Sequence, residues 1–586
     1  MADAIREERT ISPAAEWLVD NFHIVDEQLR EIREDLPNRY YRELPKLETG
    51  SLADYPRVYA LSYEYVAHTD SRFETDTLRR FVLAYQRASP LTMGELWAVP
   101  IFFRIVLVEN LRRLAERIVQ RRVAREEADA LSDSLLGLAP AGASSWEEQV
   151  RERDRRPLPV AFAVHLLQRL RERDPEKTPA LSWLTRRIEE QGLLPDEIVR
   201  IEQQEQVATH ITVRNVITSM RLVSAVDWAD FFESVSLVEK TLREGTRVEE
   251  MDFPTRDRYR HAVEDLSRRS PLSEVSVAEL ATKKSRQAAR ESTGTTASDA
   301  RRADPGYYLI SGGRRAFERE IGYRVPLGQY LRRAYFAAAA PGYVGTILLV
   351  TAALLSVPVA LSIAAGEARW ELFALALLAL LPASDVAVFV VNRDVTELVG
   401  PRRLPKLALE HGIPHDLHTL VAVPALLTNE EAVRELAERL EVHYLANADD
   451  ELRFALLTDW EDAPEESAEG DEALFAQASA AIEDLNRRHG KLPDGSRRFL
   501  FLHRRRVRNA KEKKWIGWER KRGKLHELDL LLRGAGATTF FPVEPLDRAT
   551  LARVRYVITL DADTRLPRGA AKKLVGTMAH PLNRPI

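Results

Sequence analysis

Two carboxylates stand one residue apart, directly after an apolar run near the end of the chain. The run Tyr556–Leu560 predicts a buried strand, and Asp561 and Asp563 follow it. Carboxylates at positions i and i+2 after a strand can share one divalent ion, because Mg²⁺ and Mn²⁺ prefer hard oxygen ligands. Such an ion offsets the charge of a departing diphosphate. The pair therefore indicates a metal and nucleotide-diphosphate site, although Asp after a strand is also a common turn or cap residue.

Other polar side chains follow two further predicted strands. The predicted strand over 417–427 is followed by three polar residues, Thr428, Asn429 and Glu430. The predicted strand over 452–460 carries Asp459 next to its end, where a carboxylate can accept hydrogen bonds from a ribose or a base. Ligands of parallel α/β sheets bind beyond the carboxyl ends of the strands. We therefore expect these residues to lie along one edge of a sheet, together with Asp561.

The stretch over 504–525, "RRRVRNAKEKKWIGWERKRGKL", is strongly basic. It could bring Lys524 or Arg520 to the phosphates of a nucleotide. A solvated loop or a segment resting on an anionic membrane surface would have the same composition. The charge is local rather than spread over a face, and the net charge of the chain is only −4, so we expect no nucleic-acid partner.

Two other functions, a zinc site and a phosphatase of the haloacid dehalogenase type, fit the sequence less well. "HGIPHDLH" offers three imidazoles, but Gly412 and Pro414 break helical spacing, which argues against a zinc site; the imidazoles are His411, His415 and His418. Phosphatases of the haloacid dehalogenase type also start from a D-x-D after a strand, but they place Thr four residues after the first Asp, where this chain has Arg565.

The elements that must position these residues alternate between strand and helix from about residue 410. Helices are predicted over 429–447, 472–490 and 524–534, and a further strand over 497–506. This alternation predicts right-handed crossovers and a mainly parallel sheet. The region 410–586 is therefore expected to be an α/β domain.

Upstream of this domain are two apolar segments, 343–365 and 372–391, joined by a short polar turn. Each is long enough to cross a hydrocarbon core of about 30 Å as a helix. Basic residues flank the pair on both outer sides, and the positive-inside rule puts both flanking regions in the cytoplasm. We expect two transmembrane helices within 341–392, preceded by a juxtamembrane segment over 307–340.

The first half of the chain reads differently. Residues 1–280 carry apolar side chains at three- and four-residue spacing, which predicts a helical cytoplasmic region. Residues 281–306 are polar and small, and are expected to be a linker. The chain contains no cysteine, which excludes disulfides, thiol nucleophiles and Cys-based zinc sites.

Several long motifs resemble one family. "YVITLDADTRLPRGAAKKLVGTMAHPLNRP" and "ERKRGKLHELDLLLRG" are similar to the transferase segment of bacterial cyclic β-1,2-glucan synthases, the large NdvB-like membrane proteins. "AEWLVDNFHIVDEQLREIREDLPNRYYRELPKL" and "IGYRVPLGQYLRRAYF" resemble that family as well. The resemblance runs along essentially the whole chain.

The resemblance implies a multi-pass enzyme of the bacterial inner membrane that polymerises glucose from UDP-glucose onto a glucan acceptor. It implies inversion at the sugar, dependence on Mg²⁺ or Mn²⁺, and a Rossmann-like GT-A fold for the transferase domain. By this likeness Asp561 and Asp563 hold the metal and the diphosphate, and Lys524 approaches the diphosphate. Asp459 lies near the uridine, and the nucleotide pocket is lined by Thr428, Asn429 and Glu430.

Such transferases also need a later acid as general base for the acceptor hydroxyl. That base is expected downstream of Ile586, so the chain is expected to be the amino-terminal portion of a longer synthase and to be inactive alone. The alternative is non-enzymatic: the helical region and the membrane hairpin would act as a scaffold or regulatory subunit for a partner.

Overall fold

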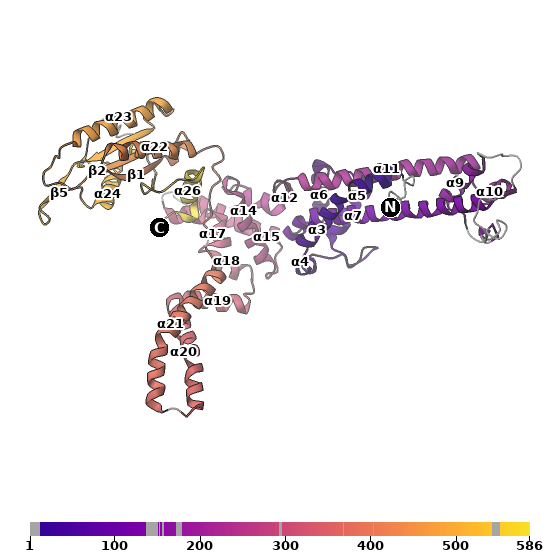
Figure 1. Cartoon of the computed structure of the whole chain (residues 1–586), viewed down its shortest axis with the longest axis horizontal. Helices are drawn as coiled ribbons and strands as arrows, with labels where there is room; N and C mark the ends of the chain where they lie inside the picture. The colour runs from indigo at the N-terminus through magenta and orange to yellow at the C-terminus, as the bar shows by residue number, and fades with distance from the viewer. Residues whose placement is uncertain are drawn as a thin grey trace. The chain divides into compact units, whose positions relative to one another are not determined.

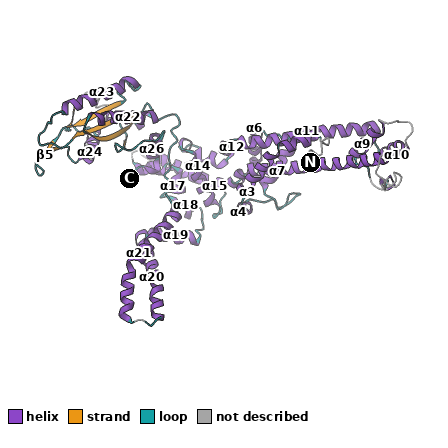
Figure 2. Cartoon of the chain, viewed as in Figure 1, coloured by secondary structure: helices purple, strands orange, loops and turns teal. Residues whose placement is uncertain are grey.

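The computed structural model describes residues 12–135, 150–151, 153–154, 157–171, 179–291, 296–366, 368–401, 403–541 and 551–585 (Figure 1). The chain forms two compact units, Met1–Lys240 and Thr241–Ile586. The boundary between them falls about forty residues before the end of the helical region that the sequence predicts. Helices dominate both units, and the long strands gather in the last third of the chain (Figure 2).

The first unit is helical throughout its described part, as the spacing of apolar residues predicts. Its helices are α2 (Pro13–Asp20), α3 (Phe22–Asp35), α4 (Asn38–Glu43), α5 (Arg57–His68), α6 (Thr75–Ala88), α7 (Met93–Leu135), α9 (Val160–Arg171), α10 (Pro179–Glu190), α11 (Pro195–Ala225), α12 (Trp228–Val235) and the start of α13 (Leu237–Arg243). Ser12 caps α2, since its side chain accepts a hydrogen bond from the Ala15 amide, and Pro13 occupies the first helical position. One core cluster of buried apolar side chains joins the end of α7 to α9, α10 and the start of α11.

The second unit opens with short helices. They are α14 (Phe253–Ser267), α15 (Glu274–Glu291), α16 (Ala297–Arg302), α17 (Pro305–Ile310), α18 (Arg314–Glu320) and α19 (Leu327–Ala337). The expected linker over 281–306 is wrong for the residues that the structure describes, because α15 continues to Glu291, and α16 and the start of α17 occupy most of the described positions after it. Residues 292–295 lie outside the described part of the chain. Ala281, Thr282 and Ser285 are buried within α15. Small side chains let a helix pack closely, so the lack of large apolar residues did not indicate exposure.

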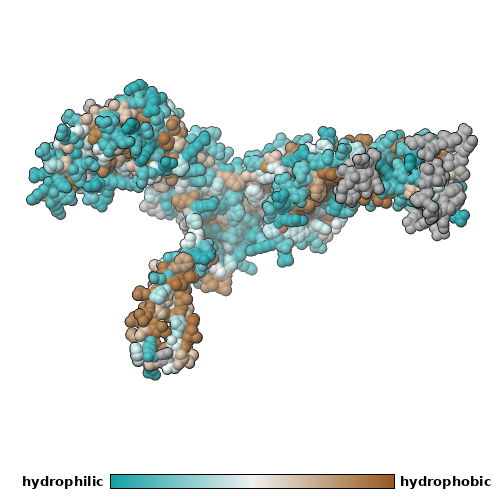
Figure 3. Space-filling model, in the orientation of Figure 1, coloured by the Kyte–Doolittle hydropathy of each residue, from teal (hydrophilic) through white to brown (hydrophobic). Residues whose placement is uncertain are grey.

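The two apolar segments form the helices α20 (Ala339–Ala364) and α21 (Arg369–Val399). At 1.5 Å per residue, their 26 and 31 residues reach roughly 39 and 46 Å, more than a hydrocarbon core of about 30 Å requires. Only 6% and 11% of their most apolar windows are buried, and Figure 3 shows apolar residues over the surface of this hairpin. Both helices are therefore suited to cross a membrane, and each extends past the 341–392 range that the sequence predicts.

The α/β part contains one five-stranded sheet in the order β6-β3-β2-β1-β7. Its strands are β1 (Thr419–Leu427), β2 (Leu452–Trp460), β3 (Phe499–Arg504), β6 (Phe540–Phe541) and β7 (Tyr556–Thr559). The pairs β1–β2, β1–β7 and β2–β3 are parallel, and β3–β6 is antiparallel. The helices are α22 (Glu430–Ala446), α23 (Asp471–His489), α24 (Arg520–Leu532) and α26 (Ala570–Ala579). The prediction of a mainly parallel α/β sheet is confirmed, with one antiparallel edge strand.

The central strands are buried on both faces, which explains their continuous apolar sequences. All nine residues of β2 are buried, and eight of the nine in β1. One core cluster lies between the sheet and α24, and a second lies near the carboxyl ends of β1 and β2 beside α22 and α23. Part of the basic stretch forms a small hairpin, β4 (Val507–Asn509) with β5 (Lys514–Ile516), and α24 begins at Arg520, earlier than predicted.

Pro424 lies inside the central strand β1, where a missing amide normally costs a hydrogen bond. The pairing of β1 with β7 ends at Ala422, whose carbonyl accepts a hydrogen bond from the Leu560 amide. Side-to-side alternation along a strand turns the nitrogen of Pro424 to this same side, beyond the end of β7. The proline therefore costs no ladder hydrogen bond, and it marks where β1 and β7 part.

A buried polar cluster joins the helices of the second unit to its last residues. The Tyr259 hydroxyl donates to Asp304 at 2.7 Å and lies 3.4 Å from His580 Nε2. Asp304 also caps α17 by accepting from the Gly306 amide at 2.7 Å. Burial raises the pKa of Asp304 to about 6, although these two hydrogen bonds lower it, and burial lowers the pKa of His580 to about 3.

Candidate functional site

The order of the strands identifies one place on the sheet. From β1 the chain proceeds to β2 and then β3 in one direction, whereas β7 returns to the other side of β1. The crevice beyond the carboxyl ends of β1 and β7 is therefore a topological switch point, where ligands of open α/β sheets bind. Asp561 follows β7, Thr428 follows β1, and Asp459 lies near the end of neighbouring β2. The prediction that these strand ends share one edge is confirmed.

Asp459 is buried between two cations. Its carboxylate accepts two hydrogen bonds from Arg504, at 2.7 and 3.0 Å, and lies 3.1 Å from Lys524 Nζ. Asp459 and Arg504 are direct neighbours in the register of β2 and β3. All three side chains are at most 3% exposed. A bidentate pair of this kind is stable in the interior only because its hydrogen bonds offset the loss of water.

Lys524 connects this cluster to β1. Its Nζ also donates to the carbonyl of Ala425. Burial lowers the pKa of Lys524; the charge of Asp459 raises it, and Arg504 lowers it further. Burial also lowers the pKa of His503 to about 3, aided by the charge of Lys524, so this neighbouring imidazole is neutral. The Nδ1 atom of His503 is 2.6 Å from the Thr458 hydroxyl.

The two predicted metal ligands lie in a turn after β7. The Thr564 amide donates to the carbonyl of Asp561 at 2.9 Å, and the side chains of Asp561 and Asp563 are exposed. Asp561 forms an ion pair with Lys521. Arg439 of α22 donates to the carbonyl of Ala562 at 2.9 Å, which fixes the turn against the helix that follows β1. Two exposed carboxylates at a sheet edge are a donor set that fits Mg²⁺ or Mn²⁺.

Thr428, Asn429 and Glu430 form the passage from β1 into α22, and all three are exposed. Asn429 is the cap of α22, since its side chain accepts from the Ala432 amide at 2.8 Å. Glu430 lies in the first turn of that helix. The side chain of Asn429 is therefore already engaged by its own helix, and Arg439 of the same helix contacts the turn that carries Asp561.

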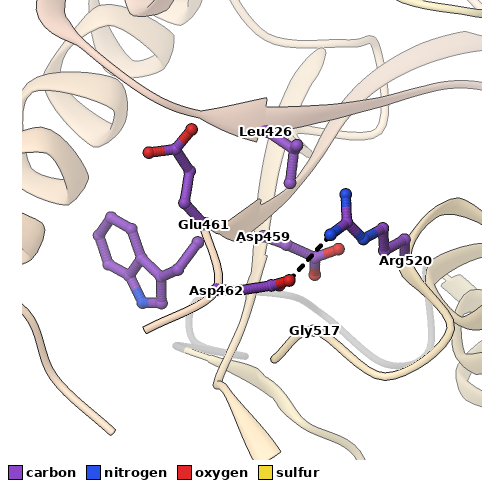
Figure 4. A pocket seen from close by; sticks show the side chains of 7 residues that line it. Leu426, Asp459, Glu461, Asp462, Gly517 and Arg520 are labelled. Atoms are coloured by element: carbon purple, nitrogen blue, oxygen red, sulfur yellow. Dashed lines mark hydrogen bonds and ion pairs between the residues drawn. The ribbon is translucent and has the colours of Figure 1, made fainter. Parts of the chain in front are cut away.

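A cavity of about 290 Å³ opens beside Asp459 (Figure 4). It is lined by Leu426, Asp459, Trp460, Glu461, Asp462, Gly517 and Arg520. Arg520 donates to Asp462 at 2.8 Å across it. A Cβ atom at Gly517 would lie 2.8 Å from the carboxyl carbon of Asp459, so this position requires glycine for the loop to approach the buried carboxylate.

The structure brings some of the predicted residues together and adds others. Asp459 and Lys524 are in contact, as a shared site requires. The site residues predicted from the sequence did not include Lys521 or Arg504, although both lie in the basic stretch 504–525. A signal for Arg504 exists in the sequence, because a charged residue at the end of a buried strand needs an opposite charge on the adjacent strand. Lys521 has no such signal, since its partner Asp561 is forty residues away.

The imidazoles considered for zinc form a different network. His415, His418 and Glu451 offer ligand atoms within 4.8 Å of one another at the amino ends of β1 and β2. Glu451 lies 2.8 Å from His415 Nδ1 and also contacts His418 Nδ1. Arg553 donates to the Nε2 atoms of both imidazoles, at 2.8 Å for His415. Arg553 therefore contacts the Nε2 atom of each imidazole and Glu451 contacts the Nδ1 atom of each, and this network lies at the edge of the sheet opposite to Asp459.

Comparison with known proteins gives one informative relative. The chain is 40% identical over 591 aligned residues to cyclic beta-(1,2)-glucan synthase NdvB of Rhizobium meliloti (strain 1021). The alignment covers 98% of this chain and 20% of that protein, so the chain spans about a fifth of the relative's length. No family model matches the chain.

Proposed function

Because the chain is NdvB-like over nearly its whole length and corresponds to the amino-terminal part of that protein, we propose that it carries the donor side of a membrane glycosyltransferase. The proposed reaction polymerises glucose from UDP-glucose into cyclic β-1,2-glucan, with inversion at the sugar. The proposed location is the inner membrane, with the α/β part on the cytoplasmic side. The similarity supports the family of reaction, and the geometry of the strand ends supports the donor site.

One observation carries the proposal. Lys521 and Lys524 lie one turn apart on α24, and they reach acids at the ends of two different strands. Lys521 pairs with Asp561 after β7, and Lys524 pairs with Asp459 near the end of β2. Positive side chains and carboxylates thus alternate around a topological switch point. A diphosphate needs an exposed cation such as Lys521, and the divalent ion that accompanies it needs carboxylates such as Asp561.

Each residue then has a proposed role. Asp561 and Asp563 would hold Mg²⁺ or Mn²⁺, which supplies positive charge to the departing diphosphate. Lys521 is exposed and adds positive charge at the same place. Lys524 is buried, and we assign it to orienting Asp459 and the end of β1 beside the nucleotide. The passage Thr428–Glu430 would line the nucleotide pocket.

The test is to measure the binding of UDP-glucose to the full chain in detergent by titration calorimetry, with and without Mn²⁺. Asp561→Ala is expected to abolish the metal-dependent part of the binding. Asp529→Ala is the matched control: it removes a carboxylate of α24 that is exposed and pairs with Arg533 at 3.1 Å, and it should leave binding unchanged.

Tight, metal-dependent binding by Asp561→Ala would contradict the assignment of the site. If the unaltered chain binds no UDP-glucose in the presence of Mn²⁺ while it retains its fold, the result would instead favour the scaffold or regulatory role.

A further inference from the structure

The helix α19 carries an apolar face next to the hairpin, and none of the residues that the structure describes covers it. Leu327, Tyr330 and Leu331 are exposed by 75%, 63% and 60%, and Ala334 extends the same stripe by one turn. The spacing i, i+3, i+4 and i+7 places these side chains on one face of the helix. Contiguous exposed apolar surface of this kind marks a site that contacts a membrane or another protein.

The opposite side of α19 is fixed to the protein. Arg333 donates two hydrogen bonds to Glu318, at 2.6 and 2.7 Å, and the Glu318 side chain is only 4% exposed. Arg314 contacts the same carboxylate at 2.9 Å. Gln329 accepts a hydrogen bond from the Tyr323 hydroxyl at 3.1 Å. These contacts on the opposite side fix the orientation of α19, so that its apolar stripe points away from the helices α17 and α18.

Continuity along the chain indicates what covers the stripe. Ala338 is the one residue between α19 and α20, and its non-helical backbone (φ −114°, ψ 44°) breaks the two helices apart. Figure 1 shows α19 between α18 and the hairpin. If α20 crosses a bilayer, α19 lies at the level of the lipid headgroups. Its composition suits that level, because Tyr side chains such as Tyr330 favour the membrane interface.

We propose that α19 is an interfacial helix that lies on the cytoplasmic leaflet with Leu327, Tyr330 and Leu331 inserted between lipids. This inference rests on the proposed membrane location of α20 and α21. The ion pair between Arg333 and Glu318 then holds the preceding helix α18 at a fixed distance from the membrane surface on which α19 lies. The α/β part follows α21, so the lipid contact would fix the height of this unit at the membrane surface.

The chain has no cysteine, which permits single-cysteine labelling without a background. We would place a nitroxide at Leu327→Cys, Leu331→Cys and Ala334→Cys of the full chain, reconstituted in phosphatidylethanolamine and phosphatidylglycerol vesicles. The matched control is Arg332→Cys, an exposed position on another side of the same helix. Leu349→Cys in α20 reports on the membrane itself. The readout is the ratio of collision rates with oxygen, which partitions into lipid, and with a water-soluble nickel chelate.

The ratio is expected to be several-fold higher at 327, 331 and 334 than at 332, and to approach the value at 349. Equal, water-like ratios at 327 and 332 beside a lipid-like ratio at 349 would overturn the proposal and leave the membrane location standing. Labels at 327 and 331 that are shielded from both reagents would also overturn it, in favour of a protein contact. A water-like ratio at 349 would overturn the membrane location and this inference together.

Discussion

The carboxylate of Asp459 is fully buried and has two cations around it, Arg504 and Lys524. Removing one member of such a group leaves the others charged and without compensation, which costs more than the group contributes as a whole. At the scale of single residues, each charged side chain of this buried cluster is therefore needed for stability, and replacing any one of them is expected to destabilise the candidate site.

Arg504→Met is expected to lower the free energy of unfolding by about 3–5 kcal/mol, because Arg504 also contacts Glu527 at 3.4 Å and its loss leaves the carboxylates of Asp459 and Glu527 with one cation, Lys524, beside them. Chemical denaturation followed by tryptophan fluorescence measures this change. Arg533→Met is the control, since it breaks the exposed pair with Asp529 and is expected to cost less than about 1 kcal/mol. Equal effects of the two substitutions would contradict the importance of the buried pair.

Asp304 is expected to make stability depend on pH. Its pKa is raised from 3.8 to about 6, so the folded chain keeps this proton over a range where the unfolded chain has lost it. Stability from this group is present below pH of about 4 and is lost as pH rises through about 6, by about 3 kcal/mol in total. Asp304→Asn keeps a side chain that can cap α17 and removes this dependence.

The measurement is the difference in free energy of unfolding between Asp304→Asn and the unaltered chain, followed from pH of about 4 to about 8. The difference should move in favour of the variant as pH rises, and become constant above pH of about 7. Asp529→Asn, at an exposed position, serves as the comparison. Parallel profiles for the unaltered chain and Asp304→Asn would contradict the raised pKa.

At the scale of elements, α26 is connected to the segment before β1 by close backbone contact. The Leu407 amide donates to the carbonyl of Gly576 at 3.0 Å, and Leu407 also bridges to Met251. A Cβ atom at Gly576 would lie 2.4 Å from the carbonyl oxygen of Leu407. This contact brings together the end of the chain, the start of the α/β part and the helices before the hairpin.

Gly576→Ala is expected to destabilise the chain by about 1–3 kcal/mol, because backbone atoms must move to admit the methyl group. Gly328→Ala, in the helix α19, meets nothing within 4 Å and is expected to stabilise by about 0.5–1 kcal/mol. Thermal unfolding of both variants in the same detergent tests the pair. The same sign for both substitutions would contradict the close approach of Leu407.

At the scale of the whole molecule, the hairpin separates the helices α14–α19 from the α/β part along the chain. Basic residues outside both ends of the hairpin predict that these two flanks share one side of the proposed membrane. Ala368 is the N-cap residue that precedes α21, at the opposite end of the hairpin, and Asp462 lies beside the candidate site. The two positions are therefore expected on opposite sides of the bilayer.

Ala368→Cys should react with a membrane-impermeant maleimide in right-side-out vesicles, and Asp462→Cys only in inverted vesicles. The absence of native cysteine makes each signal specific. Labelling of both positions from the same side would contradict the proposed topology, and with it the placement of the candidate site in the cytoplasm.

The elements of the α/β part and their order could be predicted from the amino-acid sequence. Short continuous apolar runs and a periodicity of 3.6 residues are both local properties, so β1, α22, β2 and α23 could be predicted within one or two residues. The apolar helices α20 and α21 could be predicted as well, although α20 begins four residues before its apolar segment and α21 ends eight residues after its own. The alternation of strand and helix implied a parallel sheet, and the parallel sheet implied that Asp459 and Asp561 share an edge.

Which residues meet depends on the tertiary fold. The pairing of Lys521 with Asp561 and of Arg553 with two imidazoles joins positions that are forty or more residues apart, and no local pattern encodes such contacts. The same limit explains the error at 281–306, where small side chains pack tightly in α15 although their hydropathy resembles that of a linker. Composition reports how much apolar surface a segment has, whereas burial depends on the shape of the neighbour that covers it.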